Sequence, residues 1–178
     1  MKGVLFNVVE DVVAEVMSVD AWDDVVEGAD VEGAYTSLGN YPDSDLMSIV
    51  AAVARTAGLD EPDTLRLTGR LGFKHLVRRA PHLLEGLDTW GQVLASLDDI
   101  IHPEVRKIYP DAAVPGFQVE SVDGGAVVTY TSARQLCALA DGLIVGAGEW
   151  YDAKLTVTHV RCVHSGDATC VMQVAEAR

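Results

Sequence analysis

The chain has 178 residues, 49% of them hydrophobic and 22% charged, a composition typical of one folded domain and not of a disordered chain. Its 27 acidic residues outnumber its 13 Lys and Arg residues, and the formal charge of −14 argues against nucleic acid and anionic membranes as partners. No apolar run reaches the ~18–20 residues that a membrane span needs, and no signal-peptide cleavage site follows the N-terminus.

Apolar residues recur every three or four positions through the first ~110 residues, which predicts helices there. The predicted helices cover residues 5–16, 46–57, 62–79 and 90–108, with a short segment at 83–87. We expect Ser44 and Asp45 to cap the second helix and Gly58 to end it, while Pro81 should end the third. Residues 20–43, rich in Gly and Asp, are expected to form a polar connection.

The pattern changes after Pro110. Two hairpins are predicted, the first turning at Asp123-Gly124-Gly125 and the second around Ser165-Gly166-Asp167. Their strands cover residues 117–122, 126–132, 155–163 and 170–174, and a long helix is expected over 133–149. The predicted fold class is therefore α+β, one domain over residues 1–178. A helical lobe of about residues 1–110 packs on a lobe of about 111–178 that holds an antiparallel sheet of about four strands.

His102 lies beside the apolar stripe of the predicted helix 90–108. A lone helical histidine is commonly a core residue that bonds to a backbone carbonyl. One histidine on a helix is also the axial ligand that a b-type heme requires. Its position alone leaves both interpretations open.

A second candidate site lies at the end of the predicted strand 126–132. Tyr130 and Ser132 point to the same face of a strand, and Arg134 follows where the strand ends. Two hydroxyls and a guanidinium can together bind a pair of carboxylates or phosphates. The alternative is a strand end with an exposed arginine.

With these motifs the chain resembles, over nearly its whole length, the heme–nitric oxide/oxygen binding (H-NOX) domains, relatives of the heme domain of soluble guanylate cyclase. The resemblance is carried by Met1–Asn7, Ile101–Val105, Tyr109-Pro110-Asp111, Pro115, Tyr130-x-Ser132-x-Arg134 and Gly142–Gly146. It implies heme b between the two lobes and His102 as the proximal iron ligand. Tyr130, Ser132 and Arg134 would hold the propionates, and Pro115 would press on the porphyrin.

Pro103 departs from the family pattern. Proline cannot donate the amide bond to Asp99 and disfavours helical geometry at the preceding residue. We therefore expect a kink of the helix at His102 itself.

The resemblance also describes the distal side of the heme. Oxygen-binding members carry a distal tyrosine where this chain has Leu139. The other pocket positions that the resemblance implies are Leu5, Val9, Gly72, Leu76 and Leu143. None of these side chains donates a hydrogen bond, which favours nitric oxide and carbon monoxide over oxygen, although the same residues would suit an ordinary core.

The three cysteines form a third candidate site with a histidine. An odd number of cysteines favours free thiols and a cytoplasmic location. The second hairpin places Cys162 opposite Cys170, with Cβ atoms ~4.5–5.5 Å apart, and Cys137 would come from the neighbouring helix. His159 joins them only if the strand bends or bulges, because residues three apart face opposite ways. Cys₃His is a structural zinc set, and some H-NOX proteins of marine bacteria look similar here and bind zinc; reduced core thiols or a redox disulfide are the alternatives.

The resemblance implies a nitric oxide sensor in which the His102–iron bond breaks and the lobes shift between two packings. Because the chain ends at Arg178, we expect signalling in trans to a histidine kinase or to a diguanylate cyclase or phosphodiesterase of cyclic-di-GMP. The sequence shows no catalytic arrangement typical of an enzyme. The alternative is a non-heme adaptor, because residues 142–174 also resemble the vinyl-reductase-type (V4R) sensory domains, which bind hydrophobic small molecules and often zinc.

Overall fold

The computed structural model describes residues 1–177, so that Arg178, the last residue of the expected domain, lies outside the described part. The helices are α1 (Gly3–Val16), α2 (Ala21–Ala29), α3 (Asp43–Ala57), α4 (Glu61–Arg79), α5 (Trp90–Ala95), α6 (His102–Ile108) and α7 (Cys137–Trp150). Short helical segments are η1 (Pro81–Leu84), η2 (Leu97–Ile101) and η3 (Val163–Ser165). The strands are β1 (Gly116–Val122), β2 (Gly125–Thr131), β3 (Leu155–Arg161) and β4 (Cys170–Glu176). The predicted α+β class is confirmed.

Helix ends follow the local signals in most places. α3 ends at Gly58, whose φ of 69° is the left-handed conformation that glycine adopts without strain. α4 begins after Asp60, which caps it by accepting a hydrogen bond from the Asp63 amide at 2.7 Å. The expected cap of α3 is wrong. The helix already starts at Asp43, and the Ser44 hydroxyl bonds to the Asp45 carboxylate and not to a backbone amide.

The polar connection predicted over residues 20–43 contains a helix, α2, which we did not expect. Trp22 and Val25 are buried, three residues apart, and Ala21, Val26 and Ala29 are only half-buried. Two buried positions make a weak periodic signal. Asp23 and Asp24 in the first turn also favour the helix, because carboxylates stabilise its N-terminus.

The helix predicted over residues 90–108 is divided into three parts. α5 is followed by η2, a π-helical turn in which the amide of Ile101 bonds to the Ser96 carbonyl at 2.9 Å. α6 then starts at His102, with Pro103 in its first turn, where no intrahelical donor is needed. We expected a kink at His102 itself; the structure instead has a widened, π-helical turn just before it.

The sheet is antiparallel throughout, with the strand order β1-β2-β4-β3. The first hairpin turns at Asp123 and Gly124, and the φ of 72° at Gly124 explains the glycine. α7 starts at Cys137, four residues later than predicted, because Arg134 turns back to bond Ser132 and Gln135 has a φ of 54°. β3 ends at Arg161 and contains a bulge between His159 and Arg161.

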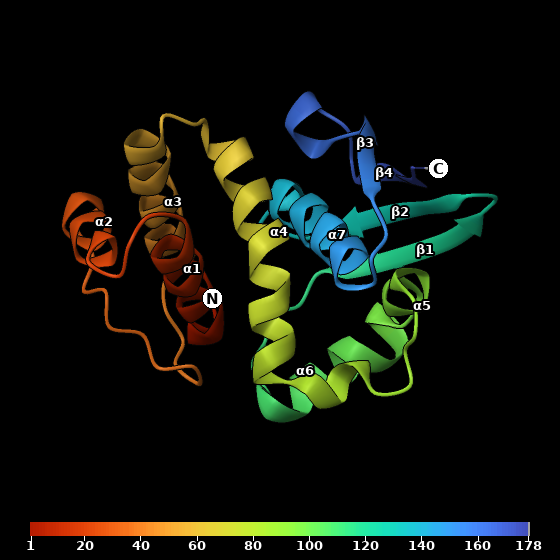
Figure 1. Cartoon of the computed structure of the whole chain (residues 1–178), viewed down its shortest axis with the longest axis horizontal. Helices are drawn as coiled ribbons and strands as arrows, with labels where there is room; N and C mark the ends of the chain where they lie inside the picture. Colours follow the sequence, from red (N-terminus) through yellow and green to blue (C-terminus); the bar gives the residue numbers. More distant parts are fainter. Residues whose placement is uncertain (178) are drawn as a thin grey trace.

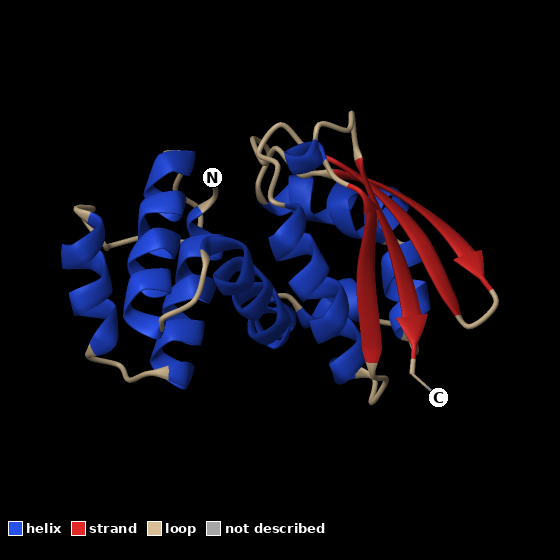
Figure 2. Ribbon diagram, turned by 90° about the horizontal axis from the view of Figure 1, so that it is seen from above, coloured by secondary structure: helices blue, strands red, loops and turns tan. Residues whose placement is uncertain are grey.

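Helix α4 lies at the centre of the molecule. Figure 1 shows α1, α2 and α3 on one side of α4, with α7 and the sheet on the other. In Figure 2 the sheet forms an outer layer, and the apolar side chains of α7 pack on its inner face. A second core joins α1, α2 and α3. No helix within residues 1–177 is long and apolar enough to cross a membrane.

Glycines allow α4 and α7 to approach closely. A Cβ atom on Gly142 would lie 2.0 Å from the Arg66 carbonyl oxygen, and one on Gly69 would lie 2.3 Å from that of Leu139. The two helices make the most extensive contact between any two elements. Their backbones therefore meet directly, in the middle of the fold.

Candidate functional site

A cavity of about 400 Å³ opens between α4 and α7 and the α5–α6 segment. Its volume lies within the roughly 300–1,000 Å³ of small-molecule sites. His102, Pro115, Tyr130, Ser132 and Arg134 all line it. The structure thus brings together residues that are up to 32 positions apart in the sequence, and most of the remaining lining is apolar.

His102 presents a neutral imidazole to this cavity. Its side chain is 12% exposed, and Nδ1 lies 3.1 Å from Oδ1 of Asp98. Burial lowers the pKa of His102, and this effect outweighs the nearby carboxylate, which raises it. Because a metal-binding histidine must be unprotonated and is usually oriented through its other ring nitrogen, this environment suits a ligand.

Asp98 is a residue that the sequence analysis missed. Its second carboxylate oxygen accepts the Phe117 amide of β1 at 2.8 Å, so that Asp98 joins the histidine to the sheet. It precedes His102 by four positions, which places both on one helix face. The four-residue spacing of Asp98 and His102 in the sequence could have identified this pair.

Arg134 is held at the edge of the cavity by two hydrogen bonds. Nε donates to Oδ2 of Asp43 at 2.7 Å, and Nη1 donates to the Ala113 carbonyl at 2.6 Å. The amide of Arg134 donates to Ser132 Oγ at 3.2 Å. A guanidinium has five N–H groups, so donors remain for an anionic ligand. Burial raises the pKa of Tyr130, which keeps its phenol protonated and able to donate.

Asp43 links Arg134 to the N-terminus of the chain. The Met1 ammonium lies 2.8 Å from Oδ1 of Asp43, while Arg134 holds the other oxygen. Burial raises the pKa of Asp43, but the two cations outweigh it and the pKa lies below its ordinary value. The carboxylate therefore stays charged and ties α3 to the segment after β2.

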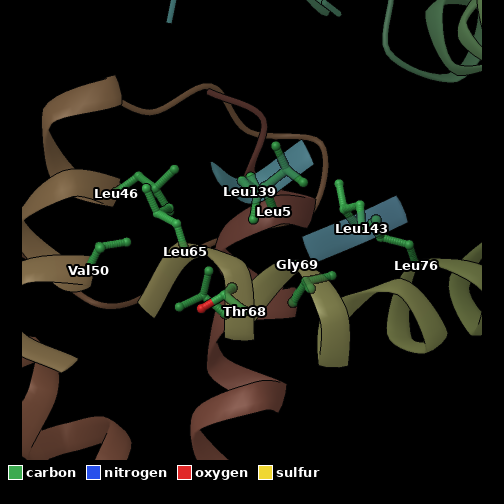
Figure 3. A pocket seen from close by; sticks show the side chains of 11 residues that line it. Leu5, Leu46, Val50, Leu65, Thr68, Gly69, Leu76, Leu139 and Leu143 are labelled. Atoms are coloured by element: carbon green, nitrogen blue, oxygen red, sulfur yellow. The ribbon is translucent and has the colours of Figure 1, made fainter. Parts of the chain in front are cut away.

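The predicted distal residues divide between two cavities. Leu5, Leu76, Leu139 and Leu143 line the large cavity and also a smaller neighbouring one, which Val9 lines as well. Figure 3 shows Leu139 and Leu143 of α7 facing Leu5 of α1 and Leu76 of α4 around the smaller cavity. Gly72 lines neither cavity, because Val8 fills the space where its Cβ would lie. Phe73 and Val77 line the large cavity and were not foreseen.

The three thiols and His159 meet between the start of α7 and the sheet, where Cys170 is the cross-strand partner of Tyr130. Their possible ligand atoms all lie within 4.8 Å of one another. Cys162 Sγ is 3.7 Å from Cys137 Sγ and 3.9 Å from Cys170 Sγ, so all three are free thiols. The bulge after His159 supplies the change of direction that the sequence required.

The cluster has the chemistry of a cation site. Burial and the two neighbouring thiols raise the pKa of Cys137 to about 12, so the thiol stays protonated in the absence of a cation. His159 Nε2 is buried and makes no hydrogen bond among the residues described, although Oδ2 of Asp141 lies 3.3 Å from it. A Zn²⁺ ion would replace the thiol protons and accept four such ligands. The residues present therefore fit zinc.

Comparison with known proteins gives one consistent result. A family model described as HNOB, haem-NO-binding, matches residues 2–159. An H-NOX protein from S. oneidensis in the Fe(II)NO state is 28% identical, with a TM-score of 0.93 and all of both chains covered. The Fe(II) unliganded H-NOX protein from K. algicida is 25% identical, with a TM-score of 0.86 and coverage of 100% of this chain and 97% of that one. A search of curated proteins gave no significant match.

The fold and the pocket define a sensor domain of the heme-binding kind, in which helices and a four-stranded sheet enclose a large, mostly apolar cavity. The chain belongs to the haem-NO-binding (H-NOX) family, whose members are heme-based gas sensors and not enzymes. The alternative of a non-heme V4R-like domain receives no support from these comparisons.

Proposed function

We propose that this chain binds heme b through His102 and senses nitric oxide. The observation that carries the proposal is one cavity lined by a neutral, oriented histidine and by the Tyr130-x-Ser132-x-Arg134 group. The S. oneidensis protein of the same fold holds NO in one structure and CO in another. When bound, heme supplies an iron atom that takes a diatomic gas on one face and a protein ligand on the other.

Different residues of the cavity would contact different parts of the heme. Tyr130, Ser132 and the free donors of Arg134 would hold the two propionates, and Pro115 would press on the porphyrin from the cavity wall. Leu139 and Leu143 offer no hydrogen bond on the distal side, which favours nitric oxide and carbon monoxide over oxygen.

We further propose that loss of the His102–iron bond carries the signal. The freed imidazole would stay attached to Asp98, and through it to the Phe117 amide, so that movement of α6 is passed to β1. The lobes, divided at about residue 110, would then shift between two packings. The output in trans is a cytoplasmic partner such as a histidine kinase, a diguanylate cyclase or a phosphodiesterase.

Cys137, His159, Cys162 and Cys170 are proposed to hold one zinc ion. Their convergence within 4.8 Å and the three free thiols support this role. Zinc would link α7, β3 and β4. None of the four residues lines the large cavity, but Tyr130, which does, is the cross-strand partner of Cys170.

The heme assignment is tested by His102→Ala. The variant should lose stable heme loading, and added imidazole should restore it, because a free imidazole can occupy the same place. His82→Ala, which removes an exposed histidine, is the matched control. An unchanged ferrous Soret spectrum in His102→Ala would contradict the proposal. Addition of nitric oxide to the loaded protein, mixed with a purified kinase, then tests the output.

A further inference from the structure

Asp141 is a buried carboxylate in the middle of α7. The residue is 7% exposed, and buried carboxylates are retained where they have partners. Its Oδ2 atom accepts a hydrogen bond from Nε of Arg66 on α4 at 3.0 Å. The same oxygen lies 3.3 Å from Nε2 of His159 on β3. One carboxylate thus stands between the candidate zinc site and the central helix.

His159 needs such a partner. A neutral imidazole can bind a metal through one nitrogen only if the other carries the proton, and a carboxylate that accepts this proton fixes both the tautomer and the ring orientation. Nε2 is buried, and Asp141 is the acceptor beside it. A small turn of the ring would complete the bond and leave Nδ1 with its lone pair for the metal.

The contact to α4 has a particular location. Asp141 precedes Gly142, whose missing Cβ lets α7 touch the carbonyl of Arg66 itself. The Arg66 side chain also pairs with Asp63, and it compensates the charge of Asp141 inside the fold. The same arginine therefore contributes both backbone and side chain to the α4–α7 junction.

We propose that Asp141 is the positioning residue of the zinc site, and that through Arg66 it couples zinc binding to the contact between α4 and α7. This inference rests on the proposed zinc site. In the coupled arrangement, zinc orders His159, His159 orders Asp141, and Asp141 holds Arg66 against α7. By linkage, whatever loosens the α4–α7 contact at Arg66 must also weaken zinc binding.

The test is zinc affinity, measured by competition with a chromophoric chelator under reducing conditions in the heme-loaded protein. Asp141→Asn should raise the zinc dissociation constant about 10- to 100-fold, as loss of an outer-shell partner does. Arg66→Gln should raise it less, roughly two- to fivefold, because the pair is partly exposed. Glu149→Gln is the matched control, since it breaks the other α4–α7 ion pair, with Arg70, without touching His159.

A spectroscopic measurement separates positioning from a general loss of structure. With Co²⁺ in place of zinc, Asp141→Asn should shift the ligand-field bands, while Glu149→Gln should leave them unchanged. The ferrous Soret spectrum reports whether each variant is folded. If Asp141→Asn does not fold, the zinc affinity of Arg66→Gln is the measurement that tests the proposal.

The outcomes distinguish the two proposals. If the parent protein takes up no zinc after metal-replete expression, the zinc site itself is wrong. If the parent binds zinc and Asp141→Asn binds it equally tightly with unchanged cobalt bands, only the positioning role is overturned. Zinc affinity in Arg66→Gln equal to that of the parent would overturn the coupling to α4.

Discussion

The carboxylate of Asp98 joins two elements at the candidate heme pocket, the turn before α6 and strand β1. It orients His102 by one oxygen and is itself held by the other. A ligand whose ring is fixed in this way loses little conformational freedom on binding a metal. We therefore expect this single residue to affect both heme affinity and signal transfer.

Asp98→Asn should weaken heme binding by about 10- to 100-fold, because the ring loses its charged partner. The rate of heme transfer to an excess of apomyoglobin measures the change. Asp99→Asn, at the exposed neighbouring position, should transfer heme at the parent rate. Equal rates in both variants would mean that Asp98 does not orient the histidine.

His102 also predicts a pH dependence for the heme-free protein. Burial lowers the pKa of its imidazole in the folded state, so the unfolded chain takes up the proton first as pH falls. Its contribution to stability is therefore complete above about pH 6.5, the unfolded value, and decreases as pH falls below it. Urea unfolding at pH 7.5 and 5.5 should show a larger loss for the parent than for His102→Gln. An equal loss in both would contradict the lowered pKa.

At the scale of elements, the α4–α7 junction depends on missing side chains. Gly142 and Gly69 each face a carbonyl oxygen of the opposite helix. Backbone contact of this kind leaves no flexible group that can move aside. A larger residue must separate the two helices, and the separation would be felt by every group that bridges them, including Arg66 and Asp141.

Gly142→Ala should lower the free energy of unfolding by about 1–3 kcal/mol, the usual cost of overpacking. Thermal or urea unfolding of the heme-loaded protein measures it. Gly28→Ala in α2 is the control, because its Cβ would make only an ordinary van der Waals contact, 4.0 Å from Cβ of Ala52, and alanine there should be neutral or stabilising by up to about 1 kcal/mol. If Gly142→Ala is as stable as Gly28→Ala, the backbones of α4 and α7 can separate at this point with little loss of stability.

At the scale of the whole molecule, the proposed gas choice follows from how α1, α4, α5, α6 and α7 and the segments between them enclose the large cavity. Leu5 of α1, Leu76 of α4 and Leu139 of α7 come from three different parts of the chain and line both this cavity, on its proposed distal side, and the smaller one that Figure 3 shows. Bound dioxygen gains negative charge and needs a donor, which these side chains lack. The enclosure as a whole, and not one residue, keeps the site apolar.

The ferrous protein in air should therefore form no stable oxy complex. Leu139→Tyr should gain oxygen affinity, because the phenol donates a hydrogen bond into the cavity, and absorption spectra of the ferrous protein under oxygen measure this. Leu139→Phe adds the ring without the hydroxyl and should behave like the parent. A stable oxy spectrum of the parent at room temperature would contradict the apolar-pocket argument.

Several features of this protein could be read from the sequence because they depend on near neighbours. Helical periodicity, the glycine stop after α3 and the Asp-Gly turn of the first hairpin are local, and each was predicted at or near its observed place. The convergence of Tyr130, Ser132 and Arg134 follows from strand alternation and a short turn. The cysteine cluster was foreseen from hairpin register, on the condition of a bulge that the structure then showed.

Other features depended on contacts between distant segments. α2 was missed because its stability comes from burying Trp22 and Val25 against the rest of the helical core, and not from its own periodicity. The division of the 90–108 segment required the π-helical turn that sets Asp98 against Phe117 of β1, 19 positions away.

By itself, the sequence determined the class of fold, the family and the identity of the candidate ligands, since these rest on residue types at short spacing. Only the tertiary structure decided which partners hold those ligands. Three carboxylates cannot be told from solvent-exposed charges in the sequence alone: Asp98 beside His102, Asp43 beside Arg134, and Asp141 between His159 and Arg66. Their roles arise because folding places each carboxylate beside a cation or an imidazole, with Asp141 buried and Asp43 and Asp98 still partly exposed, and that pairing is a property of three-dimensional packing.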